Sequence, residues 1–232
     1  MIDNVLAISD LTKRYGDFLA VDGFNLKLKK GTVHGLVGPN GAGKSTMLSI
    51  ISGLRRKTSG EINFGLPQKE IMLMPTTPDF FGFLTARQTV DLARSPFLES
   101  VPETNIQKVI SDVGLSDAID KKVGGFSRGM KQRLGLATTI IGQPNLILLD
   151  EPCSALDPIG RHDVLEIVNK LKENATVLFS THILSDVETV CDSVTVVDHG
   201  KTLYEGTVKG ISSKNKSFEA SVIELLRPSG VL

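Results

Sequence analysis

The sequence lacks the features that mark several classes of protein. Among its 232 residues, lysine and arginine together number 26, as do aspartate and glutamate, so it has no basic excess that would attract nucleic acids nonspecifically. We therefore expect no nucleic-acid partner. Its two cysteines, Cys153 and Cys191, have no metal-ligand spacing, which favours two packed thiols over a disulfide or a metal site.

Long apolar runs are also missing. The longest uncharged run, residues 134–149, is interrupted by Gly142 and Pro144 and is shorter than the roughly 20 apolar residues that cross a bilayer. The first residues include Asp3 and show no basic region followed by an apolar one, so we expect no secretory signal and a cytosolic chain. No internal repeat or low-complexity segment occurs, which favours one core over a repeat array.

What the sequence does contain is a phosphate-binding pattern. Residues 38–46 have the sequence Gly-Pro-Asn-Gly-Ala-Gly-Lys-Ser-Thr, which includes G-x-x-x-x-G-K-[ST]. The glycines let the backbone wrap closely round a phosphate with its N–H groups pointing inward, and the lysine adds a positive charge. The four fixed positions match by chance in roughly one chain in a hundred of this length. We expect nucleotide contacts from Gly38, Pro39, Asn40, Gly41, Ala42, Gly43, Lys44, Ser45 and Thr46.

The hydrophobic pattern around this loop predicts an α/β fold. The apolar run 33–37 predicts a buried strand, and a helix at 45–52 would point its positive end at the phosphates. Residues 5–11 and 24–28 predict an antiparallel β layer, and residues 85–141 carry helix start and stop signals. Further strands are predicted at 61–64, 71–74, 146–149 and 176–179, a hairpin at 193–197 and 202–205, and a helix at 159–172.

Together these elements predict a P-loop core with a mostly parallel sheet. An antiparallel β layer precedes this core, and a helical subdomain at about 85–141 is inserted between two of its strands. We assign residues 1–210 to a single domain. The tail at 211–232 receives no assigned structure.

Two carboxylates follow the apolar strand at 146–149. Ligand chemistry in open α/β sheets gathers at the carboxyl ends of the strands, and charges beside a buried run need a cation or a polar role. We expect Asp150 to hold Mg²⁺ together with the hydroxyl of Ser45, and Glu151 to activate a water molecule. His182 follows the strand at 176–179 on the same edge, which favours a phosphate contact over a structural role.

An aromatic residue stands at the turn of the predicted antiparallel layer. Tyr15 is one of only two tyrosines, and it lies in the turn-forming stretch 14–17. A flat amphipathic ring at this point suits stacking on a purine, but it equally suits an exposed turn. The spacing of the residues does not choose between these two interpretations.

With these motifs in view, residues 5–210 resemble the ATP-binding cassette (ABC) ATPases. Residues 126–133, Phe-Ser-Arg-Gly-Met-Lys-Gln-Arg, stand where this family has its signature motif, and residues 154–157 stand at its D-loop. The resemblance implies ATP and Mg²⁺ as ligands. It further implies that adenine stacks on Tyr15, that Mg²⁺ contacts Asp150, that Glu151 polarises the attacking water and that His182, the switch histidine, touches the γ-phosphate.

The resemblance also implies partners. In this family the signature residues, here Ser127 and Gly129, contact the ATP held by the P-loop of another subunit, so the chain would form a head-to-tail dimer with a second copy or a paralogue. The Ser-Arg-Gly-Met form and the Phe-rich segment before Thr85 are similar to bacterial transporters whose ATPase and membrane parts are separate chains. The implied protein is an ATP-hydrolysing subunit, peripheral on the inner face of the cell membrane through a transmembrane permease.

Two motifs depart from the family pattern. The signature motif is usually Leu-Ser-Gly-Gly-Gln, and here Arg128 and Met130 replace Gly and Gln. At the Q-loop, Thr76 follows Pro75 where a Gln or Glu is expected. The contacts to Mg²⁺ and water that are usually assigned to that position must therefore be made differently.

Alternative functions share only part of these motifs. A soluble ABC ATPase acting on ribosomes or DNA usually carries two cassettes or long coiled-coil inserts, and this chain has neither. A small-molecule kinase shares the P-loop but does not explain the signature, D-loop and histidine together. The rings of Phe80, Phe81 and Phe83 lie either in the core under the helices or in a groove for a helix of the membrane subunit, and their position after Thr76 favours the groove.

Overall fold

The computed structural model describes residues 4–154, 156–211 and 216–227. Within these residues, a six-stranded sheet has the order β5-β6-β7-β3-β8-β9, and a three-stranded sheet has the order β2-β1-β4. The pairs from β5 to β8 are parallel, and β9 pairs with β8 antiparallel. Three expectations fall partly outside this description: the missing signal argued from residues 1–3, Ala155 of the D-loop, and residues 212–215 and 228–232 of the tail.

The predicted elements lie close to their expected ranges, whereas α6, α7 and α8 were not predicted. The strands are β1 (Asn4–Tyr15), β2 (Phe18–Lys29), β3 (Val33–Val37), β4 (Ser59–Phe64), β5 (Ile71–Met74), β6 (Leu146–Asp150), β7 (Thr176–Thr181), β8 (Ser193–Asp198) and β9 (Lys201–Thr207). The helices are α1 (Lys44–Ile51), α2 (Ala86–Arg94), α3 (Thr104–Asp112), α4 (Arg128–Ile140), α5 (Pro158–Leu171), α6 (Leu184–Val190), α7 (Val208–Ile211) and α8 (Phe218–Leu226). β1 and β2 are longer than predicted because they stay paired as far as Tyr15 and Phe18.

The central sheet is covered on both faces. Leu146 and Leu148 of β6 belong to a core that also contains apolar residues of α1, β1 and β2. Ile147 and Leu149 of the same strand point into the opposite core, with residues of α4 and α5. Every residue of β3, β6 and β7 is buried, as expected for parallel strands packed between two layers. Packing on both faces therefore holds the carboxyl ends of these strands in fixed positions.

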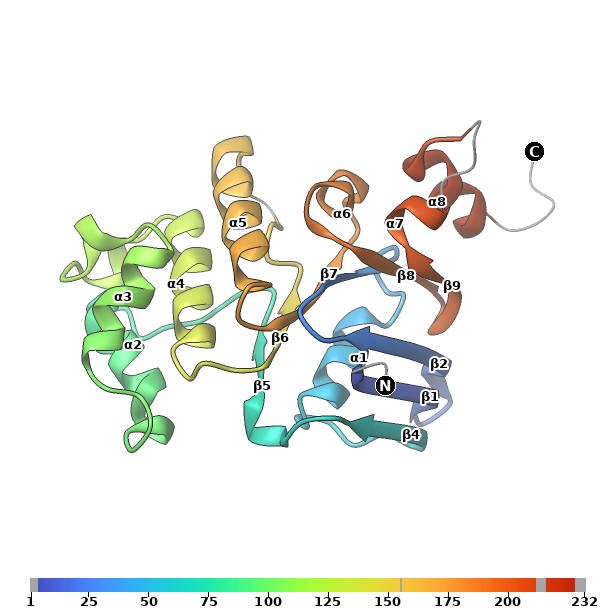
Figure 1. Ribbon diagram of the computed structural model, residues 1–232, viewed down its shortest axis with the longest axis horizontal. Coiled ribbons are helices and arrows are strands. Elements are labelled where there is room, and N and C mark those ends of the chain that lie inside the picture. Colours follow the sequence, from blue (N-terminus) through green and yellow to red (C-terminus); the bar gives the residue numbers. More distant parts are fainter. Residues whose placement is uncertain (1–3, 155, 212–215, 228–232) are drawn as a thin grey trace.

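The helical subdomain is inserted between two neighbouring strands, as predicted. The chain leaves β5, forms α2, α3 and α4, and returns as β6, which pairs with β5. Figure 1 shows these helices grouped at the left, away from the antiparallel sheet at the lower right. α2 begins with a capping box between Thr85 and Gln88, and Gly114 follows α3 with a φ of 67°. The start signal at Thr85 and the stop signal at Gly114 are thus confirmed, whereas Gly124 and Gly125 precede α4 and end no α-helix.

The tail contains structure that the sequence pattern did not reveal. α8 is capped at its N-terminus by Ser217, whose hydroxyl accepts a hydrogen bond from the backbone N–H of Ala220. Phe218 and Val222 are buried in a third core with residues of β8 and α6. A helix this short owes its stability to tertiary packing rather than to its own propensity, which is why the sequence alone left it unassigned.

Neither cysteine forms a disulfide in the described part of the chain, as predicted. Burial raises the pKa of Cys153 to about 12 and also raises the pKa of Cys191, so both are protonated, packed thiols. Within the described residues, none of the helices combines the length and the apolar character that crossing a bilayer requires.

Candidate active site

The glycine loop connects β3 to α1 and packs tightly against two other strands. A Cβ atom on Gly38 would lie 2.2 Å from the carbonyl oxygen of Val197 in β8, and one on Gly43 would lie 2.5 Å from that of Ala20 in β2. Gly43 also has a φ of 97°, which disfavours any larger side chain. These contacts explain why glycine stands at both positions and hold the loop in one place relative to β2 and β8.

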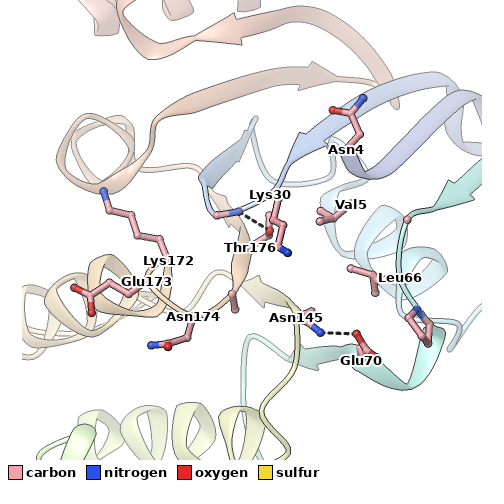
Figure 2. A pocket seen from close by; sticks show the side chains of 14 residues that line it. Asn4, Val5, Lys30, Leu66, Glu70, Asn145, Lys172, Glu173, Asn174 and Thr176 are labelled. Atoms are coloured by element: carbon pink, nitrogen blue, oxygen red, sulfur yellow. Dashed lines mark hydrogen bonds between the residues drawn. The ribbon is translucent and has the colours of Figure 1, made fainter. Parts of the chain in front are cut away.

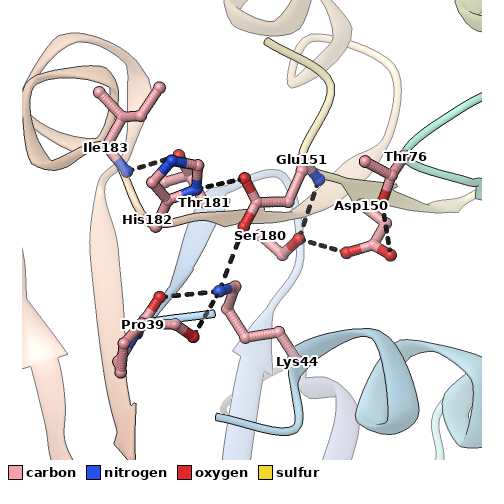
Figure 3. Close-up of polar contacts among 10 residues, drawn as sticks. Pro39, Lys44, Thr76, Asp150, Glu151, Ser180, Thr181, His182 and Ile183 are labelled. Atoms are coloured by element: carbon pink, nitrogen blue, oxygen red, sulfur yellow. Dashed lines mark hydrogen bonds and ion pairs between the residues drawn. The ribbon is translucent and has the colours of Figure 1, made fainter. Parts of the chain in front are cut away.

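Lys44, the first residue of α1, is held by its own loop. Its side chain is only 6% exposed, and its ammonium donates hydrogen bonds to the carbonyl oxygens of Gly38 at 2.7 Å and Pro39 at 3.1 Å. The same ammonium forms an ion pair with Oε1 of Glu151 at 3.1 Å. Figure 3 shows this convergence of the P-loop lysine on the carboxylate that follows β6.

Glu151 connects the lysine to the predicted switch histidine. Its second carboxylate oxygen, Oε2, lies 2.6 Å from Nδ1 of His182 (Figure 3). The backbone of Glu151 has a φ of 50°, an uncommon conformation for a residue other than glycine. Its N–H donates to the hydroxyl and the carbonyl oxygen of Ser180. The structure therefore brings Lys44, Glu151 and His182 into one chain of contacts. The strained backbone conformation belongs to Glu151, the central residue of this chain.

Asp150 is held from two sides. Ser180, its register partner on β7, donates a hydrogen bond of 2.7 Å to Oδ1, and the hydroxyl of Thr76 donates one of 3.0 Å to Oδ2. Gln132 of α4 in turn donates to the carbonyl oxygen of Thr76 at 3.1 Å. The short side chain at the Q-loop position thus contacts the carboxylate directly. Ser180 and Gln132 were not singled out in the sequence, because only strand pairing and helix packing bring them here.

The position of His182 depends on the helix that follows it. Asp186 in the first turn of α6 is fully buried, and its Oδ1 accepts a hydrogen bond of 2.5 Å from Nε of Arg161 in α5. Burial raises the pKa of Asp186, and the Arg161 guanidinium opposes that rise. Because a buried carboxylate is costly without a partner, this pair fixes α6 against the helix that follows the D-loop.

A cavity of about 420 Å³ opens beside these residues. It is lined by Lys44, Thr76, Glu151, Ser154 and His182, together with the loop residues Asn40, Gly41, Gly43, Ser45 and Thr46. Phe18 and Ala20 of β2 complete the lining. Phe18 was not predicted as a site residue, and its only signal in the sequence is its place three residues after Tyr15.

Seven predicted site residues are not among the described residues that line this cavity: Tyr15, Gly38, Pro39, Ala42, Ser127, Gly129 and Asp150. The ring of Tyr15 lies 4.8 Å from Nζ of Lys13, and its hydroxyl accepts a hydrogen bond of 3.2 Å from Arg55. Ser127 and Gly129 lie at the start of α4 in the helical subdomain, where the Ser127 hydroxyl caps the helix by accepting from Met130 N–H. Their assignment to a nucleotide site rests on the family resemblance.

The residues predicted to hold Mg²⁺ have suitable donors. Mg²⁺ takes oxygen ligands and commonly uses one or two protein groups, with phosphates and water supplying the rest. Asp150 offers a carboxylate whose orientation Ser180 and Thr76 secure, and the exposed Ser45 offers a hydroxyl in the cavity. Hydrogen-bonded carboxylates of this kind are typical of metal ligands, so the residues present fit the ion.

A second cavity, of about 340 Å³, lies at the opposite ends of the strands. It is lined by Lys30, Glu70, Asn145, Lys172 and Thr176, among others. Figure 2 shows Asn145 hydrogen-bonded to Glu70, while Thr176 accepts a bond from the backbone N–H of Gly31. These two hydrogen bonds join the segment before β6 to the segment before β5, and β7 to the loop before β3.

Comparison with known proteins places these motifs in context. The family model described as "ABC transporter" matches residues 21–154. The chain is 37% identical to the uncharacterized ABC transporter ATP-binding protein YxlF of Bacillus subtilis (strain 168), over 96% of this chain and 78% of that protein. It is 36% identical to the bacitracin transport ATP-binding protein BcrA of Bacillus licheniformis, over 94% of this chain and 74% of that one. Identity to the lantibiotic transport ATP-binding protein SrtF of Streptococcus pyogenes is 35%, over 94% and 98%.

Solved structures give the same picture. The structure of an ATP-binding subunit of an ABC transporter superposes with a TM-score of 0.84 at 28% identity, covering 96% of this chain and 100% of the other. CbiO1 from Clostridium perfringens, part of the ABC transporter complex cbiONQ, superposes with a TM-score of 0.79 at 26% identity over 90% of each chain.

Proposed function

This chain belongs to the family of ABC transporter ATP-binding proteins, and from that premise we propose which of its residues bind and hydrolyse ATP. It is an ATPase, the ATP-binding and ATP-hydrolysing subunit of a transporter that acts with a membrane partner. The residue assignment rests on one observation, the contact chain from Lys44 through Glu151 to His182 inside the P-loop cavity.

Each member of this chain has a distinct role in the proposal. The triphosphate lies along the P-loop, where backbone N–H groups and the ammonium of Lys44 bind its oxygens. Phosphate oxygens compete with Glu151 for that ammonium, which leaves the Glu151 carboxylate to accept a proton from the attacking water. His182, oriented by its contact with Glu151, contacts the γ-phosphate.

Mg²⁺ would be held by Asp150 and Ser45. When bound, this ion neutralises negative charge on the phosphates. Thr76 supports it indirectly, because its hydroxyl holds one oxygen of Asp150 in place. We therefore assign to Thr76 a positioning role in place of the direct contact made by a Gln at the Q-loop.

The site is completed by a second subunit in this proposal. Ser127 and Gly129 lie in the helical subdomain, and neither belongs to the described lining of the chain's own P-loop cavity. An ATP molecule bound to one P-loop would meet these residues on the other member of a head-to-tail pair, which is a second copy or a paralogue.

The membrane partner docks beside the Q-loop. Phe81 and Phe83 are 59% and 70% exposed, and their ring centroids lie 5.6 Å apart. Exposed aromatic residues of this kind serve as anchors in protein interfaces. We assign to them the surface that receives a separate transmembrane permease, which holds the subunit on the inner face of the cell membrane.

Two of the relatives suggest a cargo class. One is named for bacitracin transport and another for lantibiotic transport. We propose bacitracin and lantibiotics as the first cargoes to test with the assembled transporter.

The variant Glu151→Gln tests the catalytic assignment. Glutamine keeps the size of the side chain but cannot accept a proton, so ATP binding should persist while hydrolysis falls by ~10²-fold or more. ATP binding is measured by calorimetry and hydrolysis by phosphate release. Glu188→Gln, an exposed glutamate on α6, is the matched control and should hydrolyse ATP like the wild type. Hydrolysis within about threefold of wild type in Glu151→Gln would overturn the assignment.

A further inference from the structure

Gln132 is a polar residue buried in α4. Its side chain is 2% exposed, and the apolar residues Leu134 and Leu136 of the same helix are buried as well. Burying an amide costs free energy unless its polar atoms find hydrogen-bond partners. The contacts of this side chain therefore show what it does.

The amide nitrogen of Gln132 bonds two segments of the chain at once. It donates to the carbonyl oxygen of Thr76 at 3.1 Å and to that of Pro152 at 3.0 Å. A primary amide nitrogen carries two hydrogens, so each acceptor receives one of them. Thr76 lies in the loop after β5 and Pro152 in the loop after β6, and these two strands are parallel neighbours. Gln132 thus connects α4 to the carboxyl ends of two adjacent strands.

Both acceptors adjoin residues of the proposed site. The hydroxyl of Thr76 donates to Oδ2 of Asp150 (Figure 3), and Pro152 directly follows Glu151. A hydrogen bond to the main chain of Thr76 fixes the point from which its hydroxyl reaches the carboxylate. Only one residue therefore separates Gln132 from each of the two carboxylates.

The backbone of Glu151 needs support of this kind. Its φ of 50° is sparsely populated for residues with a side chain, and such a conformation persists only where neighbouring contacts enforce it. On the N-terminal side, the N–H of Glu151 donates to Ser180. On the C-terminal side, Gln132 holds the carbonyl oxygen of Pro152. The two contacts restrain the strained residue from both directions.

Close packing of α4 against the loop after β5 brings the amide within reach. A Cβ atom on Gly135 would lie 2.6 Å from Cγ of Pro78 and 3.0 Å from Cε of Met74, so glycine is what allows the helix to approach this closely. Gln132 and Gly135 are three positions apart and share one face of the helix. That face of α4 is therefore the one seated on the loop that contains Thr76.

We propose that Gln132 is a positioning residue for ATP hydrolysis, whose two hydrogen bonds hold Asp150 and Glu151 in the orientations that the reaction requires. The inference rests on the proposed function of these carboxylates. Gln132 itself is not among the described residues that line the P-loop cavity, so it acts through Thr76 and Pro152 rather than on the nucleotide. Its loss should therefore slow hydrolysis without weakening nucleotide binding.

The test replaces the amide with a side chain that cannot donate. Gln132→Met keeps the length of the side chain and removes the donor from both carbonyl oxygens. Loss of a residue that orients a metal ligand typically lowers metal affinity or activity by about 10- to 100-fold. We expect kcat for ATP hydrolysis to fall by at least about tenfold and the Mg²⁺ concentration for half-maximal rate to rise. ADP affinity, measured by calorimetry without Mg²⁺, should stay within about twofold of the wild type.

Thr139→Val is the matched control. Thr139 is buried in the same helix, and its hydroxyl donates to the carbonyl oxygen of Gly135 within that helix. Its replacement also removes a buried hydrogen bond, but one inside the helix rather than one to either loop. Its kcat and its Mg²⁺ requirement should therefore equal those of the wild type. An equal fall of kcat in Thr139→Val and Gln132→Met would overturn the inference, because any loosening of α4 would then suffice.

A double-mutant cycle separates positioning from a general loss of stability. Thr76→Val removes the hydroxyl that holds Asp150. Adding Gln132→Met to it should therefore raise the Mg²⁺ requirement by much less than Gln132→Met does alone. Equal factors in the two backgrounds contradict the proposal. Gln132→Glu preserves the volume of the side chain but turns carboxylate oxygens towards both carbonyl oxygens. It should lose at least as much kcat, and it decides the question if the methionine variant does not fold.

The variant Glu151→Gln tells this inference apart from the proposed function. Hydrolysis by Glu151→Gln at the wild-type rate would overturn the proposed function, and with it the premise of this inference. If Glu151→Gln is inactive and Gln132→Met keeps kcat and the Mg²⁺ requirement within about twofold of the wild type, only the role of Gln132 is overturned.

Discussion

At the scale of single residues, His34 makes the stability of the fold depend on pH. It lies in β3, is 2% exposed, and its two ring nitrogens are 2.7 and 2.8 Å from the hydroxyls of Ser193 and Thr195. Burial lowers its pKa from 6.5 to about 3. Between these values the unfolded chain binds a proton that the folded chain does not, so stability is complete above pH ~6.5 and falls as the pH drops towards ~3.

This linkage is measured with the variant His34→Gln. Glutamine also donates and accepts hydrogen bonds but does not titrate. Between pH 7.5 and pH 5, the wild type should lose about 2 kcal/mol more unfolding free energy than His34→Gln, at about 1.4 kcal/mol for each pH unit below 6.5. Urea unfolding at both pH values gives the comparison. An equal pH dependence of the two proteins would contradict the assignment to His34.

Thr76 is the second residue whose chemistry can be tested alone. Its hydroxyl donates to Asp150 at 3.0 Å, and loss of a bond that orients a metal ligand typically lowers metal affinity by about tenfold or more. Thr76→Val keeps the shape and removes the hydroxyl. It should therefore raise the Mg²⁺ concentration required for half-maximal ATP hydrolysis by that factor. Thr76→Gln supplies the longer side chain and should raise basal hydrolysis modestly. Unchanged Mg²⁺ dependence in Thr76→Val would exclude the positioning role.

At the scale of elements, the segment between β5 and α2 separates buried from exposed aromatic residues. Phe80 is partly buried and packs against the core of the helical subdomain, whereas Phe81 and Phe83 are exposed. The segment is fastened near its α2 end, since the N–H of Gly124 donates to the carbonyl oxygen of Gly82 and that of Val123 to the carbonyl oxygen of Leu84. The hypothesis that all these rings form the core is wrong for Phe81 and Phe83.

The docking role assigned to these rings leads to a prediction. Phe83→Ser should leave basal ATP hydrolysis and the melting temperature nearly unchanged and abolish co-purification with the membrane chain. Phe80→Ser is the matched control. Because it removes a packed ring, it should lower the melting temperature by several degrees. A similarly large drop in the melting temperature of Phe83→Ser would show that this ring is packed in the core, and would contradict its role in docking.

At the scale of the whole molecule, the distribution of the motifs favours a working pair. Lys44, Glu151 and His182 meet at one edge of the central sheet, whereas Ser127 and Gly129 lie in the helical subdomain. With Glu151→Gln, which prevents turnover, ATP and Mg²⁺ should convert monomer to dimer in sedimentation experiments, because the nucleotide favours the state that binds it on both sides. Adding Ser127→Arg should block this conversion. A monomer at saturating ATP and high protein concentration would argue against the pair.

Features that depend only on residues close together in the sequence were predicted from it. The limits of β3 and β5 match the predicted ranges, because both are short, mostly apolar runs that are followed by glycine or proline. The helical subdomain was recognisable from its caps, and the P-loop from the spacing of its glycines and lysine. Each of these signals lies within a few residues of the structure it specifies.

Contacts between distant segments were decided by the tertiary structure. Thr76 and Asp150 are 74 positions apart, and Ser180 and Asp150 are 30 apart. They meet because β6 lies beside β5 and β7 in the sheet. Periodicity identifies a strand but carries no information on its neighbours, so neither contact follows from the sequence pattern. The same holds for Phe18, which reaches the cavity because β2 crosses the P-loop at Ala20 and Gly43. The sequence by itself thus determined most of the elements and the family, and the order of the strands decided which side chains share the site.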